Sequence, residues 1–133
     1  MSFSHNFIVS TNSELFKLTA SIQIIGKDIL VVIYGGKAHI GAIAVAQPRP
    51  SSKDITKISS SSSVFTITGH KEDVFTKNIS EVLAKRFNTM AIVTGGVHWD
   101  NISSEDIDKI NENILYLQEI IVEKIGSIMA PKN

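Results

Sequence analysis

The sequence predicts an α+β fold, in which two helices pack on a mainly antiparallel β-sheet. Short apolar segments with a period of two come first along the chain, and two segments with helical periodicity follow. Strands grouped ahead of helices are typical of α+β architectures. The expected order of elements is ββββαβα, and a length of 133 residues suits a single domain over residues 1–133.

The clearest strands lie in the first third of the chain. Between residues 14 and 25 the even positions are apolar and most odd positions are polar, which is typical of a strand with one solvated face. Residues 29–34 are apolar at every position and are therefore predicted to be a central strand covered on both faces. Residues 3–9 alternate more weakly and are a candidate edge strand.

The following segment, residues 39–46, has unusually small side chains, which would let a helix, another backbone or a flat ligand approach closely. Pro48 and Pro50 are expected to end this strand. Residues 47–63 include the unbroken run Ser59–Ser63 and offer little to bury, so they are predicted to be a mobile surface loop, either a linker or a lid. Another strand is expected at residues 64–68.

Two helices are predicted around one further buried strand at residues 89–93. The first helix opens near Gly69, and its apolar positions keep helical spacing from Phe75 to Phe87. The second runs from Ser104 to about residue 128, where its apolar positions recur at three and four: Ile107, Ile110, Ile114, Leu117, Ile121 and Ile125. Leu115, Ile120 and Val122 widen this stripe and suggest burial against a second subunit.

Composition excludes several classes of function. The 13 basic residues balance 13 acidic ones, so no excess positive charge points to nucleic acid or to an anionic membrane as a partner. Cysteine is absent, which excludes disulfides, thiolate catalysis and cysteine-ligated metal sites. The N-terminus does not read as a signal peptide, and no apolar run approaches the roughly 20 residues of a membrane span. The expected location is therefore the cytoplasm.

Three of the four histidines follow glycines at predicted strand ends. They are His39 after Gly35-Gly36, His70 after Gly69, and His98 after Gly95-Gly96. If these ends converge, neutral imidazoles could bind a metal or shuttle protons, although the spacing matches no zinc signature and no metal site is predicted. A purely structural role in turns is the alternative.

Two segments have more specific chemistry. Thr68-Gly69-His70-Lys71 precedes a helix, whose unpaired N–H groups make a candidate phosphate or carboxylate cradle, although an ordinary turn would look the same. Trp99 could form a wall for an aromatic ligand, with hydrogen bonds from His98 and Asn101. Alternatively, Trp99 covers core and Asn101 belongs to a turn or helix cap. No nucleophile elbow or carboxylate pair is present, so no catalytic residue is predicted.

Three blocks of sequence together resemble the LpdD-like family: residues 35–44 with Pro48 and Ser51 after them, residues 68–72, and residues 95–102. These small proteins are associated with gallate decarboxylase as its D subunit and are described as prenylated-flavin chaperones. The resemblance covers residues 14–128 and implies a fold similar to the proteasome assembly chaperones, with assembly into dimers. It further implies a non-catalytic protein that handles prenylated flavin mononucleotide (prFMN) for a UbiD-type decarboxylase.

The resemblance favours the cradle and the aromatic wall. The residues proposed for cofactor binding, to prFMN or FMN, are Gly35, Gly36, His39, Gly41, Thr68, Gly69, His70, Lys71, Gly95, Gly96, His98, Trp99 and Asn101. The leading hypothesis is a homodimeric cofactor chaperone without turnover. An assembly module that binds no ligand is the second hypothesis, and a hydrolase or isomerase that uses His39, His70 and His98 is the third.

Overall fold

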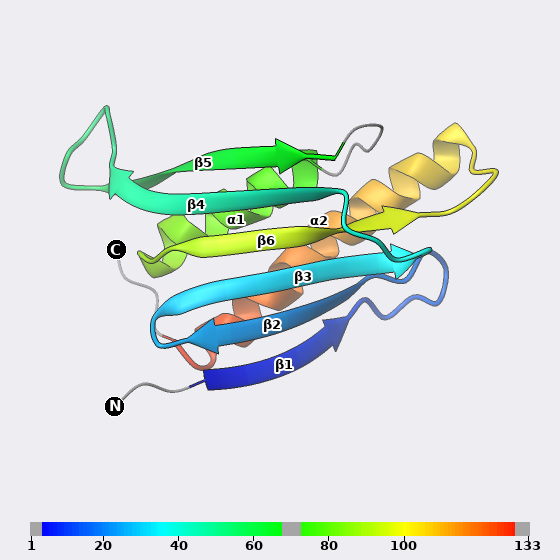
Figure 1. Cartoon of the computed structure of the whole chain (residues 1–133), viewed down its shortest axis with the longest axis horizontal. Helices are drawn as coiled ribbons and strands as arrows, with labels where there is room; N and C mark the ends of the chain where they lie inside the picture. The colour runs from blue at the N-terminus through cyan, green and yellow to red at the C-terminus, as the bar shows by residue number, and fades with distance from the viewer. Residues whose placement is uncertain (1–3, 68–72, 130–133) are drawn as a thin grey trace.

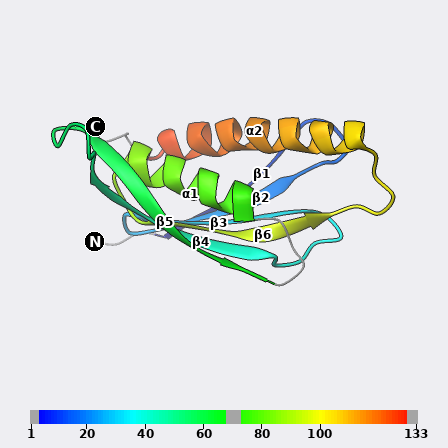
Figure 2. The same ribbon diagram turned by 90° about the horizontal axis from the view of Figure 1, so that it is seen from above.

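A computed structural model describes residues 4–67 and 73–129 of the chain, as six strands and two helices. The elements are β1 (Ser4–Ser10), β2 (Thr19–Ile25), β3 (Asp28–Gly36), β4 (Ala42–Pro50), β5 (Ile58–Thr66), α1 (Asp73–Phe87), β6 (Ala91–His98) and α2 (Ser104–Gly126). The strands form one sheet (Figure 1). Both helices lie on the same face of this sheet (Figure 2). Within the described residues, neither helix has the length and apolar character needed to cross a membrane.

The spatial order of the strands is β1-β2-β3-β6-β4-β5. All neighbouring pairs are antiparallel except β3 and β6, which are parallel because β6 returns to the middle of the sheet after α1. The predicted α+β class is therefore confirmed. Five strands precede α1 instead of four, since the candidate edge strand is present as β1.

The alternating pattern predicted between residues 14 and 25 is confirmed from Thr19 to Ile25, whereas residues 15 and 16 form a turn instead of strand. Strand β3 is central as expected. Ile29, Val31 and Ile33 of β3 are buried toward the helices. The prediction that β3 is covered on both faces is wrong, because Leu30, Val32 and Tyr34 are only partly buried. Their side of the sheet has no helix on it, and we call it the open face. A run of apolar residues showed that β3 lies inside the sheet but not which faces are covered.

The predicted mobile loop at residues 47–63 is also wrong, because β4 continues through Pro50 and the serine run is part of β5. Two features explain the difference. The pairing of β4 with β6 ends at Ala46, so a proline at position 48 or 50 removes no hydrogen bond from that pair. Serines of β5 are also fixed by side-chain bonds that a composition-based prediction does not consider.

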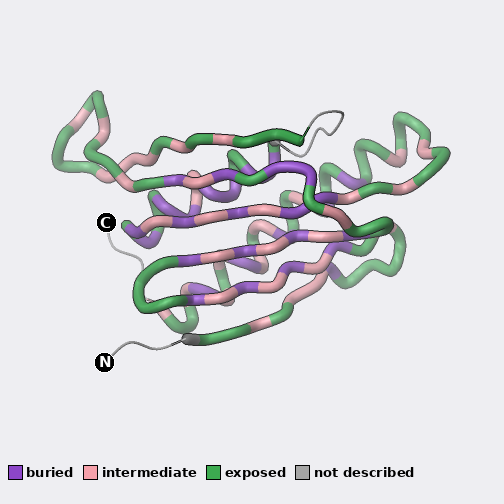
Figure 3. Tube along the Cα trace, in the orientation of Figure 1, coloured by how far each residue is buried: buried purple, intermediate pink, exposed green. Residues whose placement is uncertain are grey.

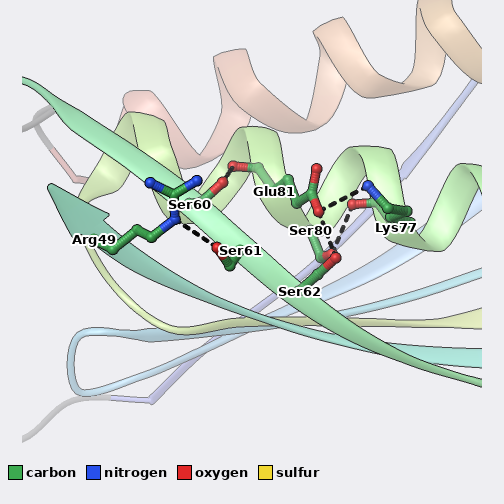
Figure 4. A network of polar contacts seen from close by, with 7 residues as sticks. All are labelled: Arg49, Ser60, Ser61, Ser62, Lys77, Ser80 and Glu81. Carbon is green, nitrogen blue, oxygen red and sulfur yellow. Dashed lines mark hydrogen bonds and ion pairs between the residues drawn. The ribbon is translucent and has the colours of Figure 1, made fainter. Parts of the chain in front are cut away.

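Those bonds join β5 to α1 and to β4 (Figure 4). Ser60 Oγ donates to the Glu81 carbonyl oxygen at 2.8 Å, and Ser62 Oγ donates to Glu81 Oε2 at 2.5 Å. Across the strand pair, Arg49 Nε donates to Ser61 Oγ at 2.5 Å. Alternate serines thus bond to the helix above the sheet, while the serine between them bonds to the neighbouring strand.

Helix α1 packs over β4, β5 and β6. The small side chains of β4 that face it, Ala42, Ala44 and Ala46, are fully buried, so the close approach predicted for this segment is that of a helix. The predicted apolar face of α1 is confirmed, since Phe75, Leu83 and other apolar residues at helical spacing from them are buried in the core. Figure 3 shows that burial is concentrated in the central strands and decreases toward β1 and β5.

Helix α2 begins where the sequence predicts. Ser103 Oγ accepts a hydrogen bond from the Asp106 N–H at 3.1 Å, and Asp106 Oδ2 accepts one from the Ser103 N–H at 3.0 Å, which together form a capping box. The helix covers β1 and β2 with a buried stripe that ends at Ile125. Of the residues that widen this stripe, Val122 packs against the core and Leu115 is 64% exposed.

Candidate functional site

A cleft of about 660 Å³ lies between the N-terminal halves of α1 and α2, next to the end of β6. It is lined by Val74, Phe75, Asn78, Ile79, Val97, His98, Trp99, Ile102, Ile107, Ile110, Asn111, Ile114, Leu115 and Gln118. No lysine, arginine, aspartate or glutamate is among them. The cleft is therefore suited to an uncharged, largely apolar group, to which the amides and His98 could offer hydrogen bonds.

Trp99 rests on the glycine pair at the end of β3. A Cβ atom added to Gly35 would lie 2.9 Å from Trp99 Cη2, and one added to Gly36 would lie 2.8 Å from Trp99 Cε2 and Nε1. Gly36 also has a φ of +63° and lies so close to the His98 carbonyl oxygen that an added Cβ would be 2.1 Å from it. Because these glycines have no side chains, the indole ring packs directly against their backbone behind the cleft.

The second glycine pair belongs to β6 itself, which extends to His98 and is longer than the predicted strand at residues 89–93. Gly95 has a φ of +140°, and a Cβ there would lie 1.8 Å from the Ile33 carbonyl oxygen. A Cβ on Gly96 would lie 2.6 Å from His39 Nε2. Gly96 makes room for this imidazole, and Gly95 for the neighbouring backbone.

His39 lies on the open face at this end of the sheet. Gly96 lies between Gly95, which is paired with the buried Ile33, and Val97, which lines the cleft. Gly96 and the His39 ring on it therefore face the open side. The ring also contacts the Lys37 carbonyl oxygen through Nδ1 at 3.1 Å.

Gly41 and Asn101 support the backbone near the site. Gly41 donates its N–H to the Gly95 carbonyl oxygen at 2.9 Å and accepts the Ile67 N–H at 2.8 Å. Asn101 is exposed, has a φ of +56° in the turn before α2, and does not line the cleft.

At the rim of the cleft, Asp100 joins a histidine and a lysine. Lys37 Nζ lies 2.6 Å from Asp100 Oδ2, and His98 Nε2 lies 2.9 Å from Asp100 Oδ1. The hydrogen bond from Lys37, followed by that from His98, lowers the pKa of Asp100. All three side chains are exposed, so the group places charge at the entrance, whereas the described residues that line the interior carry no lysine, arginine, aspartate or glutamate.

The structure thus brings His98 and Trp99 into the cleft and places Gly35 and Gly36 behind Trp99. His39, Gly41, Gly95, Gly96 and Asn101 lie around this end of the sheet without lining the cleft. The predicted cradle residues Thr68, Gly69, His70 and Lys71 lie outside the described residues. Within residues 4–67 and 73–129, no three histidine, aspartate or glutamate side chains are grouped as metal ligands.

Sequence reasoning missed most of the cleft lining. Phe75, Asn78, Asn111 and Gln118 come from two helices whose predicted faces were assigned to the core or to solvent. One signal was present: Leu115 widens the apolar stripe of α2 beyond what a sheet face needs. That excess was attributed to a second subunit, whereas in the structure Leu115 lines the cleft.

Residues 12–126 match the family model described as the prenylated flavin chaperone LpdD-like domain. No curated protein matches the chain. Among solved structures, a chain from a chaperone complex for yeast 20S proteasome assembly is similar, with a TM-score of 0.59 and 11% sequence identity. The alignment covers 93% of this chain and 96% of the yeast chain, and at this identity the similarity shows a shared fold.

Proposed function

Because the chain belongs to the LpdD-like family of prenylated flavin chaperones, we propose that it binds prFMN without turnover and passes it to a UbiD-type decarboxylase. The observation that supports this most strongly is the uncharged cleft beside Trp99. Its volume of about 660 Å³ lies within the range of small-molecule sites, roughly 300–1,000 Å³.

The chemistry of the lining suggests how the ligand is arranged. An isoalloxazine ring extended by a prenyl-derived ring has broad, flat faces and a polar pyrimidine edge, and Trp99 and Phe75 could contact such a face. The phosphate would remain outside, because no cationic side chain among residues 4–67 and 73–129 lines the interior to offset its desolvation. Thr68, Gly69, His70 and Lys71 remain the proposed phosphate cradle, and Lys37 at the rim is a second cation near the entrance.

Titration with prFMN and with FMN tests this proposal. Trp99 is the only tryptophan, so quenching of its fluorescence reports directly on the cleft. We expect saturable quenching and a raised melting temperature with prFMN, and weaker effects with FMN. Trp99→Ala lacks the fluorescent reporter, so its affinity would be followed by flavin absorbance, and we expect a loss of about tenfold. Leu15→Ala, an exposed position outside the cleft, is the matched control. Absence of both quenching and thermal stabilisation with either flavin would contradict the proposed flavin binding.

We also propose that the chain forms a homodimer through the open face. The uncharged character of this face favours an assembly role as the second candidate function. One row crosses all six strands as Ile8, Ser21, Val32, Thr94, Ile43 and Phe65. The adjacent row is Asn6, Gln23, Leu30, Ile92, Val45 and Ser63. Neither row contains a charge, and Ile8 and Phe65 are more than 70% exposed. A second copy would bury this surface without leaving an unpaired charge.

A further inference from the structure

One buried amide fastens the connection between β1 and β2 to helix α2. Asn113 is 7% exposed, and its Nδ2 donates to the carbonyl oxygens of Leu15 at 3.2 Å and Phe16 at 3.0 Å. A buried amide left without partners is destabilising, so these two bonds strongly favour this position of the connection. They hold Phe16 with a φ of +53°, in the left-handed region that a residue with a side chain rarely adopts.

The base of the same connection is also closed. Thr11, which is buried, donates its N–H to the Leu18 carbonyl oxygen at 3.0 Å, and its Oγ1 accepts the Leu18 N–H at 3.0 Å. Residues 11–18 are therefore tied at their ends by Thr11 and at Phe16 by Asn113. The Phe16 ring is attached to a backbone that has little freedom to move.

Phe16 uses this fixed position to contact Trp99. The two rings meet edge to face, with centroids 5.2 Å apart and planes at 79°. The indole also rests on the backbone of Gly35 and Gly36. Trp99 is thus held by two contacts that come from distant parts of the chain, and it lines the cleft from that position.

We propose that Asn113 and Phe16 are positioning residues, which fix Trp99 as a preformed aromatic wall of the cleft. Neither residue lines the cleft. The inference rests on the proposed function, because the consequence is that flavin affinity depends on residues that the ligand does not touch. A wall fixed before binding does not lose side-chain freedom when the ligand arrives, so it favours tight binding.

The variants Asn113→Leu and Phe16→Leu test this role. Leucine at position 113 removes the amide without adding charge, and leucine at position 16 removes the aromatic edge but keeps an apolar side chain. Tyr116→Phe is the matched control, because it removes only the exposed hydroxyl that accepts from Asn12 Nδ2 at 3.1 Å in the same connection. Tryptophan emission and the dissociation constants of FMN and prFMN would be measured for each folded variant.

We expect red-shifted emission and an affinity reduced about fivefold in Asn113→Leu and Phe16→Leu, with both properties unchanged in Tyr116→Phe. Unchanged emission in the two leucine variants overturns the positioning role, whatever flavin does. Shifted emission with unchanged flavin affinity overturns it as well, because the wall would not matter. If Asn113→Leu does not fold, Phe16→Leu alone decides. Absence of flavin binding by the wild-type chain instead overturns the proposed function.

Discussion

At the scale of single residues, the glycines near the site make room for other parts of the same chain. Gly36 has the same backbone conformation as Gly26, with φ near +60° in both, but their surroundings differ. An added Cβ at Gly26 would meet nothing within 4 Å, whereas one at Gly36 would meet the His98 carbonyl oxygen and the Trp99 indole. Comparing substitutions at Gly26 and Gly36 therefore separates the cost of backbone strain from the cost of a steric clash.

Alanine at each position should show this difference. Gly26→Ala is expected to lower the free energy of unfolding by about 1–2 kcal/mol, the usual strain of a left-handed alanine. Gly36→Ala should lower it by more than about 3 kcal/mol, because a backbone clash adds to the strain. Urea unfolding would measure both values. Equal losses of unfolding free energy would mean that the surroundings of Gly36, including Trp99, adjust to accommodate a methyl group.

At the scale of elements, one carboxylate contributes to the contact between α1 and β5. Glu81 Oε2 accepts from Ser62 Oγ and lies 3.0 Å from Lys77 Nζ. Burial, the largest single influence, raises the pKa of Glu81, but the bonds from Ser62 and Lys77 and the charges of Lys77 and Arg49 together lower it below 4.5. The ionised form is therefore the one that holds the strand to the helix.

This lowered pKa predicts a pH dependence of stability. A carboxylate whose pKa is lower in the folded state stabilises the protein above its unfolded pKa, and this contribution is lost as the pH falls through the folded pKa. Glu81→Gln should lower the free energy of unfolding by about 1 kcal/mol at neutral pH. The difference from wild type should shrink as the pH falls through the lowered folded-state pKa of Glu81, as followed by urea unfolding. Glu119→Gln, on an exposed position of α2, is the control, and an equal pH-dependent difference there would contradict the assignment.

The elements also show how far the sequence could predict this fold. Alternation predicted the strand that forms β2, although this strand begins only at Thr19, and helical spacing predicted α2 from Ser104, because these signals are local in the chain. The serine run was misassigned because its order depends on Glu81, about twenty positions away. The cleft was missed for the same reason, since its walls come from α1, β6 and α2 and no single segment carries its pattern.

At the scale of the whole molecule, two surfaces are candidates for contact with a second copy of the chain. The first surface is the open face, which has uncharged rows across six strands. The second is the exposed part of the apolar stripe of α2, which includes Leu115 at the cleft. Val32 lies near the centre of the first row and is only partly buried within one chain. A charge at Val32 would be buried without a partner in a dimer formed through the open face.

Val32→Lys should therefore convert a dimer to monomer, whereas Leu115→Lys should leave the dimer intact. Sedimentation velocity at several protein concentrations would measure the change, and circular dichroism would confirm that both variants fold. Dissociation of Leu115→Lys, with Val32→Lys still dimeric, would assign the contact to α2. A wild-type chain that is monomeric at all concentrations would contradict the homodimer.

The parallel pairing of β3 with β6 has a consequence for the order in which the protein forms during synthesis. A nascent chain that ends after α1 contains two strand groups, β1-β2-β3 and β4-β5, and no strand pairing yet joins them. Only when residues 91–98 leave the ribosome can the central strand close the sheet, and this contact between distant segments should limit the folding rate. Trp99 and α2 come later still, so the nascent chain cannot hold a ligand in the cleft until the sheet is nearly complete.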